Sequence, residues 1–191
     1  MCVEQTVTKR GILFMENRKQ KEFFQKCLYE ALIKLMKRKL FVDISVSELC
    51  EEAGVSRMTY YRSYSSKEDI LKQHLEVCFE RFMCELRDRT NMSFYEIAVT
   101  FFEFWENEEK EFLAALIDSG LSTNLMDLFY EYLDVIYESM ELGETVEAFV
   151  KSFLAGGLYK LLIDWIKSDS NTPIQEMAEF LAKGSKALVE K

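Results

Sequence analysis

The stretch of sequence that decides the fold is residues 44–71, which read ISVSELCEEAGVSRMTYYRSYSSKEDIL. Ser45 and Glu48 have the spacing of a capping box, in which a hydroxyl and a carboxylate satisfy the free backbone donors at the start of a helix. This pattern predicts a short helix over residues 46–52. Gly54 then supplies the positive φ that a sharp turn after the helix needs.

A second short helix is expected directly after this turn. Ser56 is placed to cap a helix over residues 57–63. Upstream, residues 18–40 carry the apolar stripe of an amphipathic helix. Downstream, a second capping pattern predicts a long helix over residues 67–89. Two short helices joined by a glycine turn and preceded by a longer helix are typical of a helix-turn-helix.

The second short helix carries side chains of the types that recognise DNA bases and phosphates. Tyr60 and Tyr64 lie four residues apart and therefore share one face, which we expect to pack inward. Arginine can pair with a guanine edge, threonine or methionine can contact a thymine methyl, and tyrosine and serine hydroxyls suit phosphate. The side chains left for the outward faces are Arg57, Met58, Thr59, Tyr61, Arg62 and Ser63.

Composition extends the helical prediction to the whole chain. The 191 residues include only seven glycines and one proline. A β-sandwich or barrel needs a turn every ~8–12 residues, and the chain lacks the residues for those turns. Helix signals recur through to residue 189. We therefore predict an all-α protein of about nine helices.

Several classes of protein and site are excluded by the same survey. No run of residues approaches the ~18 apolar residues of a membrane span, so no membrane partner is expected. The chain has no nucleophile elbow and no phosphate-binding glycine loop, so it is not expected to be an enzyme. His74 is the single histidine and the five cysteines form no close pair. These counts predict that the protein holds no metal or cofactor. They also predict that it is cytoplasmic and that its thiols are reduced.

Charge is distributed unevenly along the chain. The net charge is −9, yet residues 1–75 carry +4 and residues 76–191 carry −13. A basic segment joined to an acidic body indicates two parts with different partners. Only the first part favours a polyanion such as DNA.

Residues 18–75 resemble the DNA-binding domain of the TetR/AcrR family of transcriptional regulators. The matching features are the turn at residues 53–56, Thr59, Tyr61, Tyr64, the residues 66–68 (Ser-Lys-Glu) and Leu71. The resemblance implies that Tyr61 and Lys67 contact the DNA backbone, and that Ser45 caps the first short helix beside a phosphate. Tyr60 and Ser63 depart from the family pattern.

The resemblance also implies an organisation in three parts. Residues 1–17 form an N-terminal arm, residues 18–75 the helix-turn-helix domain, and residues 76–191 a domain that binds an effector and dimerises. In this last part, residues 144–168 are apolar almost all round a helix, and the final helix carries an apolar stripe. We expect both to form a four-helix dimer interface through Phe153, Gly156, Gly157, Leu161, Trp165, Met177, Leu181 and Leu188.

An aromatic group is the candidate lining of an effector pocket. It consists of Phe101, Phe104, Trp105 and Phe129. Side chains of this type serve a cavity and an ordinary core equally well, so both interpretations stay open at the level of sequence.

The sequence therefore predicts a homodimeric regulator that binds a double-stranded DNA operator. A repressor released by an unidentified small-molecule effector is the expected mechanism. The alternative is a helical protein–protein interaction module that retains the helix-turn-helix only as structure.

Overall fold

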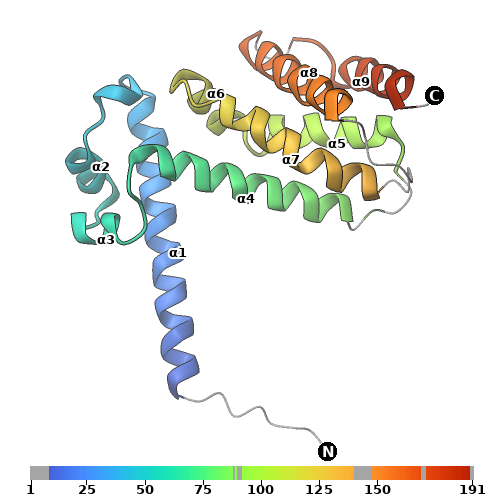
Figure 1. The fold of residues 1–191 in the computed structure, drawn as a ribbon. Coiled ribbons are helices and arrows are strands. Elements are labelled where there is room, and N and C mark those ends of the chain that lie inside the picture. The colour runs from blue at the N-terminus through green and yellow to red at the C-terminus, as the bar shows by residue number, and fades with distance from the viewer. Residues whose placement is uncertain (1–8, 88, 90–91, 140–147, 169–170, 190–191) are drawn as a thin grey trace, which may run out of the picture. The chain divides into compact units, whose positions relative to one another are not determined.

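The computed structural model describes residues 9–87, 89, 92–139, 148–168 and 171–189. Within these residues every regular element is a helix, which confirms the all-α prediction. The elements are α1 (Lys9–Met36), the 3-10 helix η1 (Phe41–Asp43), α2 (Val46–Ala53), α3 (Arg57–Tyr61), α4 (Lys67–Arg87), α5 (Phe94–Asn107), α6 (Lys110–Asp118), α7 (Thr123–Ser139), α8 (Ala148–Lys167) and α9 (Ile174–Val189) (Figure 1).

The chain divides into two compact units, Met1–Leu71 and Lys72–Lys191. The boundary between them falls inside α4, as does the domain boundary expected after residue 75. In the part of the chain that the structure describes, no helix combines the length and the apolar character needed to cross a bilayer.

Short-range side-chain caps explain where several helices begin. The Ser93 hydroxyl accepts from the backbone N–H of Glu96, and the Glu96 carboxylate accepts in return from the N–H of Ser93. Ser66 and Asp69 make the same reciprocal pair at the start of α4, with distances of 3.0 and 3.3 Å. Both pairs have the spacing of a capping box, in which a serine precedes an acidic residue by three positions.

Two local predictions differ from the structure. Helix α1 begins at Lys9 rather than at residue 18, because residues 9–17 hold no proline and the backbone continues as a helix ahead of the apolar stripe. The capping box at Ser45 is half formed, since the Glu48 carboxylate pairs with Lys39.

The core of the first unit forms where α1, α2 and α3 meet. Leu28 and Leu32 of α1 and Leu49 of α2 are fully buried. Tyr60 of α3 is also fully buried, and Tyr64 follows it into the core with 6% of its surface exposed. Burial of these apolar side chains fixes α3 against the two earlier helices.

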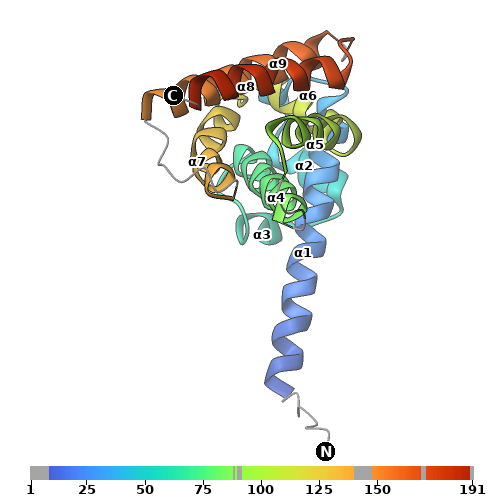
Figure 2. The ribbon, with the colours of Figure 1, turned by 90° about the vertical axis from the view of Figure 1, so that its right-hand side faces the viewer.

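The second unit is built from helix pairs. Helix α5 packs along α9, α7 packs along α8, and α6 contacts both α5 and α8. The two ribbon views both place α8 and α9 together along one edge of this unit (Figure 2). Its core is unusually aromatic, with Phe102, Trp105 and Phe112 almost completely buried.

The Tyr60 hydroxyl offers a direct test of this packing, because it is buried without a hydrogen-bond partner among the described residues. Tyr60→Phe removes that unsatisfied group and should raise the free energy of unfolding by about 1 kcal/mol. Urea denaturation measures the change. Tyr61→Phe is the matched control, since the neighbouring ring is exposed and its loss of a hydroxyl should change nothing.

The same substitution should alter the response to alkali. Burial, with smaller contributions from Tyr61 and Asp69, raises the pKa of Tyr60 from 10.0 to about 12. The folded state therefore favours the neutral phenol, and this contribution to stability is complete below pH 10 and disappears as the pH rises through about 12. Tyr60→Phe should abolish that alkaline loss. Equal stability curves for the wild-type and Tyr60→Phe proteins would contradict the burial.

Candidate functional site

The turn between α2 and α3 is set by one residue. Gly54 ends α2 with φ of 66° and ψ of 29°, in the left-handed region that favours glycine. Its N–H bonds to the carbonyl of Glu51 at 3.2 Å, and the N–H of Val55 bonds to the carbonyl of Cys50 at 3.0 Å. These bonds satisfy carbonyls at the end of α2, and the chain turns toward α3, which begins three residues after Gly54.

Helix α3 is held at its start by a side-chain cap. The Ser56 hydroxyl accepts from the backbone N–H of Thr59 at 3.1 Å and shares a hydrogen bond of 2.9 Å with the Thr59 hydroxyl. Tyr60 and Tyr64 then turn inward with their ring centres 6.0 Å apart. Gln25 of α1 hydrogen-bonds Tyr64. These contacts fix the rotation of α3 about its axis.

The opposite side of this segment is available to solvent. We call it the α3 outer face, and it consists of Arg57, Met58, Thr59, Tyr61, Arg62 and Ser63. Met58 is 72% exposed and Tyr61 is 61% exposed. Arg57 and Arg62 are exposed as well, while Thr59 and Ser63 are half-buried. The division into inward and outward side chains is the one that the sequence predicts.

Positive charge next to this face is only partly neutralised. Lys34 and Arg38 of α1 both pair with Glu52 of α2, and the hydrogen bond from Lys34 holds the pKa of Glu52 below its ordinary value. Arg57 and Arg62 form no ion pair with any residue that the structure describes. Two guanidinium groups on the exposed face are thus left for an external anion.

Lys67 is placed differently from a simple surface lysine. Its ammonium donates to the carbonyl oxygens of Phe41 at 2.8 Å and Ile44 at 2.5 Å, and it lies 4.6 Å from the centre of the Phe41 ring. Lysine has three donors, and two of them close the loop before α2. The expected contact with the DNA backbone is therefore left to the third, while Lys67 also holds the loop together.

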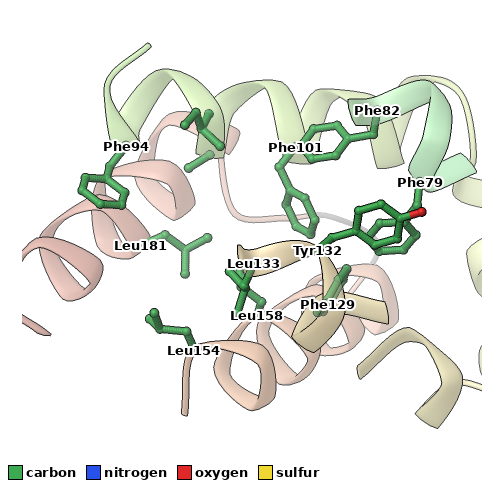
Figure 3. A pocket seen from close by; sticks show the side chains of 12 residues that line it. Phe79, Phe82, Phe94, Phe101, Phe129, Tyr132, Leu133, Leu154, Leu158 and Leu181 are labelled. Atoms are coloured by element: carbon green, nitrogen blue, oxygen red, sulfur yellow. The ribbon is translucent and has the colours of Figure 1, made fainter. Parts of the chain in front are cut away.

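A cavity of about 70 Å³ lies in the second unit. Its lining comes from α4, α5, α7, α8 and α9, and Figure 3 shows the side chains converging from these helices. The residues are Phe79, Phe82, Phe94, Ile97, Ala98, Phe101, Phe129, Tyr132, Leu133, Leu154, Leu158 and Leu181. Of these twelve side chains, the Tyr132 hydroxyl alone is polar.

Two of the four predicted pocket residues line this cavity and two do not. Phe101 and Phe129 belong to the lining. Phe104 and Trp105 are instead core residues, with 4% and 1% of their surfaces exposed and their rings 5.5 Å apart. They lie three and four residues after Phe101 on α5, one turn further along the same side of the helix. Phe79 and Phe82 of α4 were not predicted, although their three-residue spacing on one helix face was a usable signal.

The electrostatics of the cavity favour a neutral occupant. Burial, followed by the carboxylates of Glu80, Glu131 and Glu76, raises the pKa of Tyr132. Its ring stacks on Phe79 with centres 5.1 Å apart. An ion inside this lining would lose its hydration and gain no opposite charge, which carries a large free-energy cost.

Large apolar side chains are exposed on both of the last two helices. Phe149 and Phe153 of α8 and Phe180 of α9 are each at least 65% exposed. A Cβ atom added at Gly156 or Gly157 meets nothing within 4 Å, so the protomer leaves open space beside both glycines. We call these five residues the α8–α9 outer face.

The predicted dimer residues separate into different environments. Phe153, Gly156 and Gly157 belong to the α8–α9 outer face, and Leu161 and Met177 are half-buried. Trp165 does not fit the prediction, because it is 2% exposed and its indole N–H donates to the Thr172 carbonyl at 2.9 Å. Leu181 is half-buried and lines the cavity. The Leu188 side chain lies outside the described residues.

A polar cluster that the sequence did not predict joins α4 to the start of α6. His74 Nε2 lies 3.0 Å from Glu109 Oε2, and Arg81 Nη1 lies 2.6 Å from Glu109 Oε1. Cys78 is fully buried beside them. Burial alone would raise the pKa of Glu109, yet the bonds from His74 and Arg81 outweigh it and hold that pKa low. The available signal was the four-residue spacing of His74 and Cys78, but Glu109 is distant in sequence.

Comparison with known proteins finds two matching family descriptions. The description "Bacterial regulatory proteins, tetR family" matches residues 28–73, and "Transcriptional regulator C-terminal region", a TetR C-terminal domain, matches residues 92–185. The comparison with curated proteins finds no match.

Two solved structures share the fold. Lin0861 from Listeria innocua is 19% identical with a TM-score of 0.74, covering 90% of this chain and 92% of its own. The dihydroxyacetone kinase operon activator DhaS is 16% identical with a TM-score of 0.60, covering 87% of this chain and 96% of its own.

The geometry of α2 and α3 and the two family matches lead to one assignment. A helix-turn-helix with an exposed, basic outer face occupies the first unit, and a regulator C-terminal region forms most of the second. The chain belongs to the TetR family of transcriptional regulators, which are non-enzymatic proteins that bind DNA.

Proposed function

We propose that this regulator binds a pseudo-palindromic operator as a homodimer, with the α3 outer face of each subunit in the major groove. The observation that carries the proposal is the pair of exposed guanidinium groups, Arg57 and Arg62, which have no ion pair among the described residues and flank Tyr61. Two such helices must reach successive major grooves about 34–36 Å apart, or a multiple of that distance.

The side chains of the outer face take different roles on the duplex. Arg57 and Arg62 pair with base edges, and Met58 and Thr59 contact thymine methyl groups. Tyr61 and Ser63 bind phosphate oxygens through their hydroxyls. Ser45, Ser56 and Lys67 position the segment, because each holds a helix start or loop in place, and the Lys67 ammonium has a third donor for the backbone of the DNA.

Arg62→Ala should relax the preference for one base pair of the operator. Loss of a bidentate contact with a guanine costs about 1–3 kcal/mol of discrimination at that position, and affinities at the other positions keep their ranking. Fluorescence anisotropy against a panel of single-base operator variants, at one fixed salt concentration, measures this. Arg87→Ala on the last turn of α4 is the matched control and should leave the whole panel unchanged.

Lys67→Ala should change DNA binding in a different way from Arg62→Ala. It should weaken binding to every sequence alike and reduce the slope of affinity against salt by about one. It should also lower the thermal midpoint, since the carbonyls of Phe41 and Ile44 lose their donor. The assigned roles are wrong if Arg62→Ala and Lys67→Ala affect all operator variants equally.

The homodimer forms through the α8–α9 outer face. Exposed phenylalanines of this size rarely gather on a monomer surface without a partner. The open space beside Gly156 and Gly157 allows the backbone of a second helix to approach closely. Four helices, α8 and α9 from each subunit, then bury the exposed rings.

Phe153→Glu should therefore convert the dimer to a monomer. A carboxylate at the centre of an apolar interface loses its hydration without gaining a partner. Sedimentation equilibrium at micromolar concentration measures the mass. Phe23→Glu on α1, where the ring is 62% exposed in the first unit, is the control and should stay dimeric. A wild-type protein that sediments as a monomer would overturn the proposal.

The cavity of the second unit binds a small, uncharged, apolar effector. Phe79 and Phe82 of its lining lie on α4, whose first residue Lys67 belongs to the DNA-binding unit. An effector that displaces α4 changes the spacing of the two α3 helices and releases the operator. Thermodynamic linkage requires that the operator weakens effector binding by the same factor.

A matched set of four-carbon probes tests the chemical class of this effector. Butanol should raise the thermal midpoint at millimolar concentration, whereas butyrate and butylammonium should not, because the lining offers no opposite charge. Ala98→Leu adds three carbons to the cavity and should abolish the effect of butanol. Equal stabilisation by the charged and neutral probes would contradict the assignment.

Operator binding represses transcription in this proposal, and the regulator acts in the cytoplasm, where the free thiols of Cys27, Cys50, Cys78 and Cys84 stay reduced. The fold neighbour DhaS is described as an operon activator, so the direction of regulation needs its own test. Expression of a reporter gene controlled by the operator should increase when the regulator is removed. A decrease would instead assign activation.

A further inference from the structure

We propose that His74, Cys78 and Glu109 bind one divalent transition-metal ion of the zinc type, with a fourth position left to water. His74 and Cys78 lie one turn apart on α4, and Glu109 directly precedes α6. One ligand atom from each residue lies within 4.8 Å of the other two. All three residues belong to the second unit.

The donor set selects the class of metal. Imidazole nitrogen, thiolate sulfur and carboxylate oxygen are the three ligand types that zinc uses in proteins. Magnesium and calcium prefer oxygen alone and would leave the sulfur and the nitrogen unused. Three protein ligands with an open fourth position are typical of zinc sites that bind water or an exogenous ligand.

The three proposed ligand atoms lie close to the separations that a zinc site requires. In a tetrahedral zinc site, bond lengths of about 2.0–2.3 Å place the ligand atoms roughly 3.5 Å apart. His74 Nε2 and Glu109 Oε2 are already 3.0 Å apart. The other two separations are within 4.8 Å, so these ligand atoms must approach each other by at most about 1.3 Å.

Neighbouring side chains hold two of the three proposed ligands in position. Arg81 binds Oε1 of Glu109, so Oε2 is left for the ion while the carboxylate keeps its orientation. Hydrogen bonds of this kind from a neighbouring residue are usual for ligating carboxylates. The Phe112 ring meets the imidazole of His74 edge to face, with centres 4.5 Å apart, and so restrains that ring.

Burial makes the three ligands unlike a surface cluster. Cys78 is fully buried, Glu109 is 6% exposed, and His74 retains partial exposure, which gives the ion a route from solvent. On binding, the Cys78 sulfur forms a bond to the metal and its proton leaves to water. The ion replaces the hydrogen bond between His74 and Glu109 with a bond to each of them.

Cobalt(II) titration tests the site through a signal that only sulfur ligation produces. The protein should carry Cys2→Ser, Cys27→Ser and Cys84→Ser, so that the thiols left are those of Cys50 and Cys78. We expect one cobalt ion per chain, a thiolate-to-cobalt charge-transfer band in the near ultraviolet, and displacement by zinc but not by magnesium.

Matched variants make the result decisive. Cys78→Ala should abolish the band, whereas Cys50→Ala, which removes the other buried thiol, should retain it. His74→Gln, which removes the imidazole ligand, should weaken zinc binding at least tenfold in competition with a chelating dye. Circular dichroism establishes that each variant is folded. The site is disproved if the wild-type ligand set gives no band, or if the band persists in Cys78→Ala.

Discussion

The left-handed backbone of Gly54 determines which side of α3 meets solvent. Because the chain turns at Gly54 and only two further residues precede α3, α3 starts with its register fixed against the two earlier helices. The Ser56 cap and the buried rings of Tyr60 and Tyr64 then leave the helix no freedom to rotate. The arginines of the outer face owe their exposure to this constraint, since each inward position is already filled by an aromatic ring.

Local chemistry made much of this fold predictable. Helix starts depend on residues three apart, so the caps at Ser56, Ser66 and Ser93 follow from spacing alone. The inward and outward sides of α3 were predictable for the same reason. Where a side chain had a competing partner distant in sequence, the prediction was incomplete: Glu48 turns to Lys39, and Lys67 turns to the loop before α2.

The second unit was harder to predict because its residue types are ambiguous. Phe101 and Trp105 lie one turn apart on α5 and are chemically alike, yet one lines a cavity and the other fills the core. Only the helices packed against α5 separate the two environments. Trp165 shows the same difficulty, since its apolar surface suited an interface but its indole N–H found a carbonyl inside the unit. The cluster at Glu109 required a contact between α4 and α6 that no local pattern specifies.

The uncompensated guanidinium groups of Arg57 and Arg62 have a consequence for the lifetime of the protein. Like charges on one short helix repel each other, and a polyanion relieves that repulsion, so the folded unit gains stability whenever DNA occupies it. Proteolysis in cells tracks how often a domain opens, and the unbound molecule opens more often than the bound one. Proteolysis would then remove first the molecules that exceed the available binding sites. The abundance of the regulator would thereby follow the number of its DNA targets.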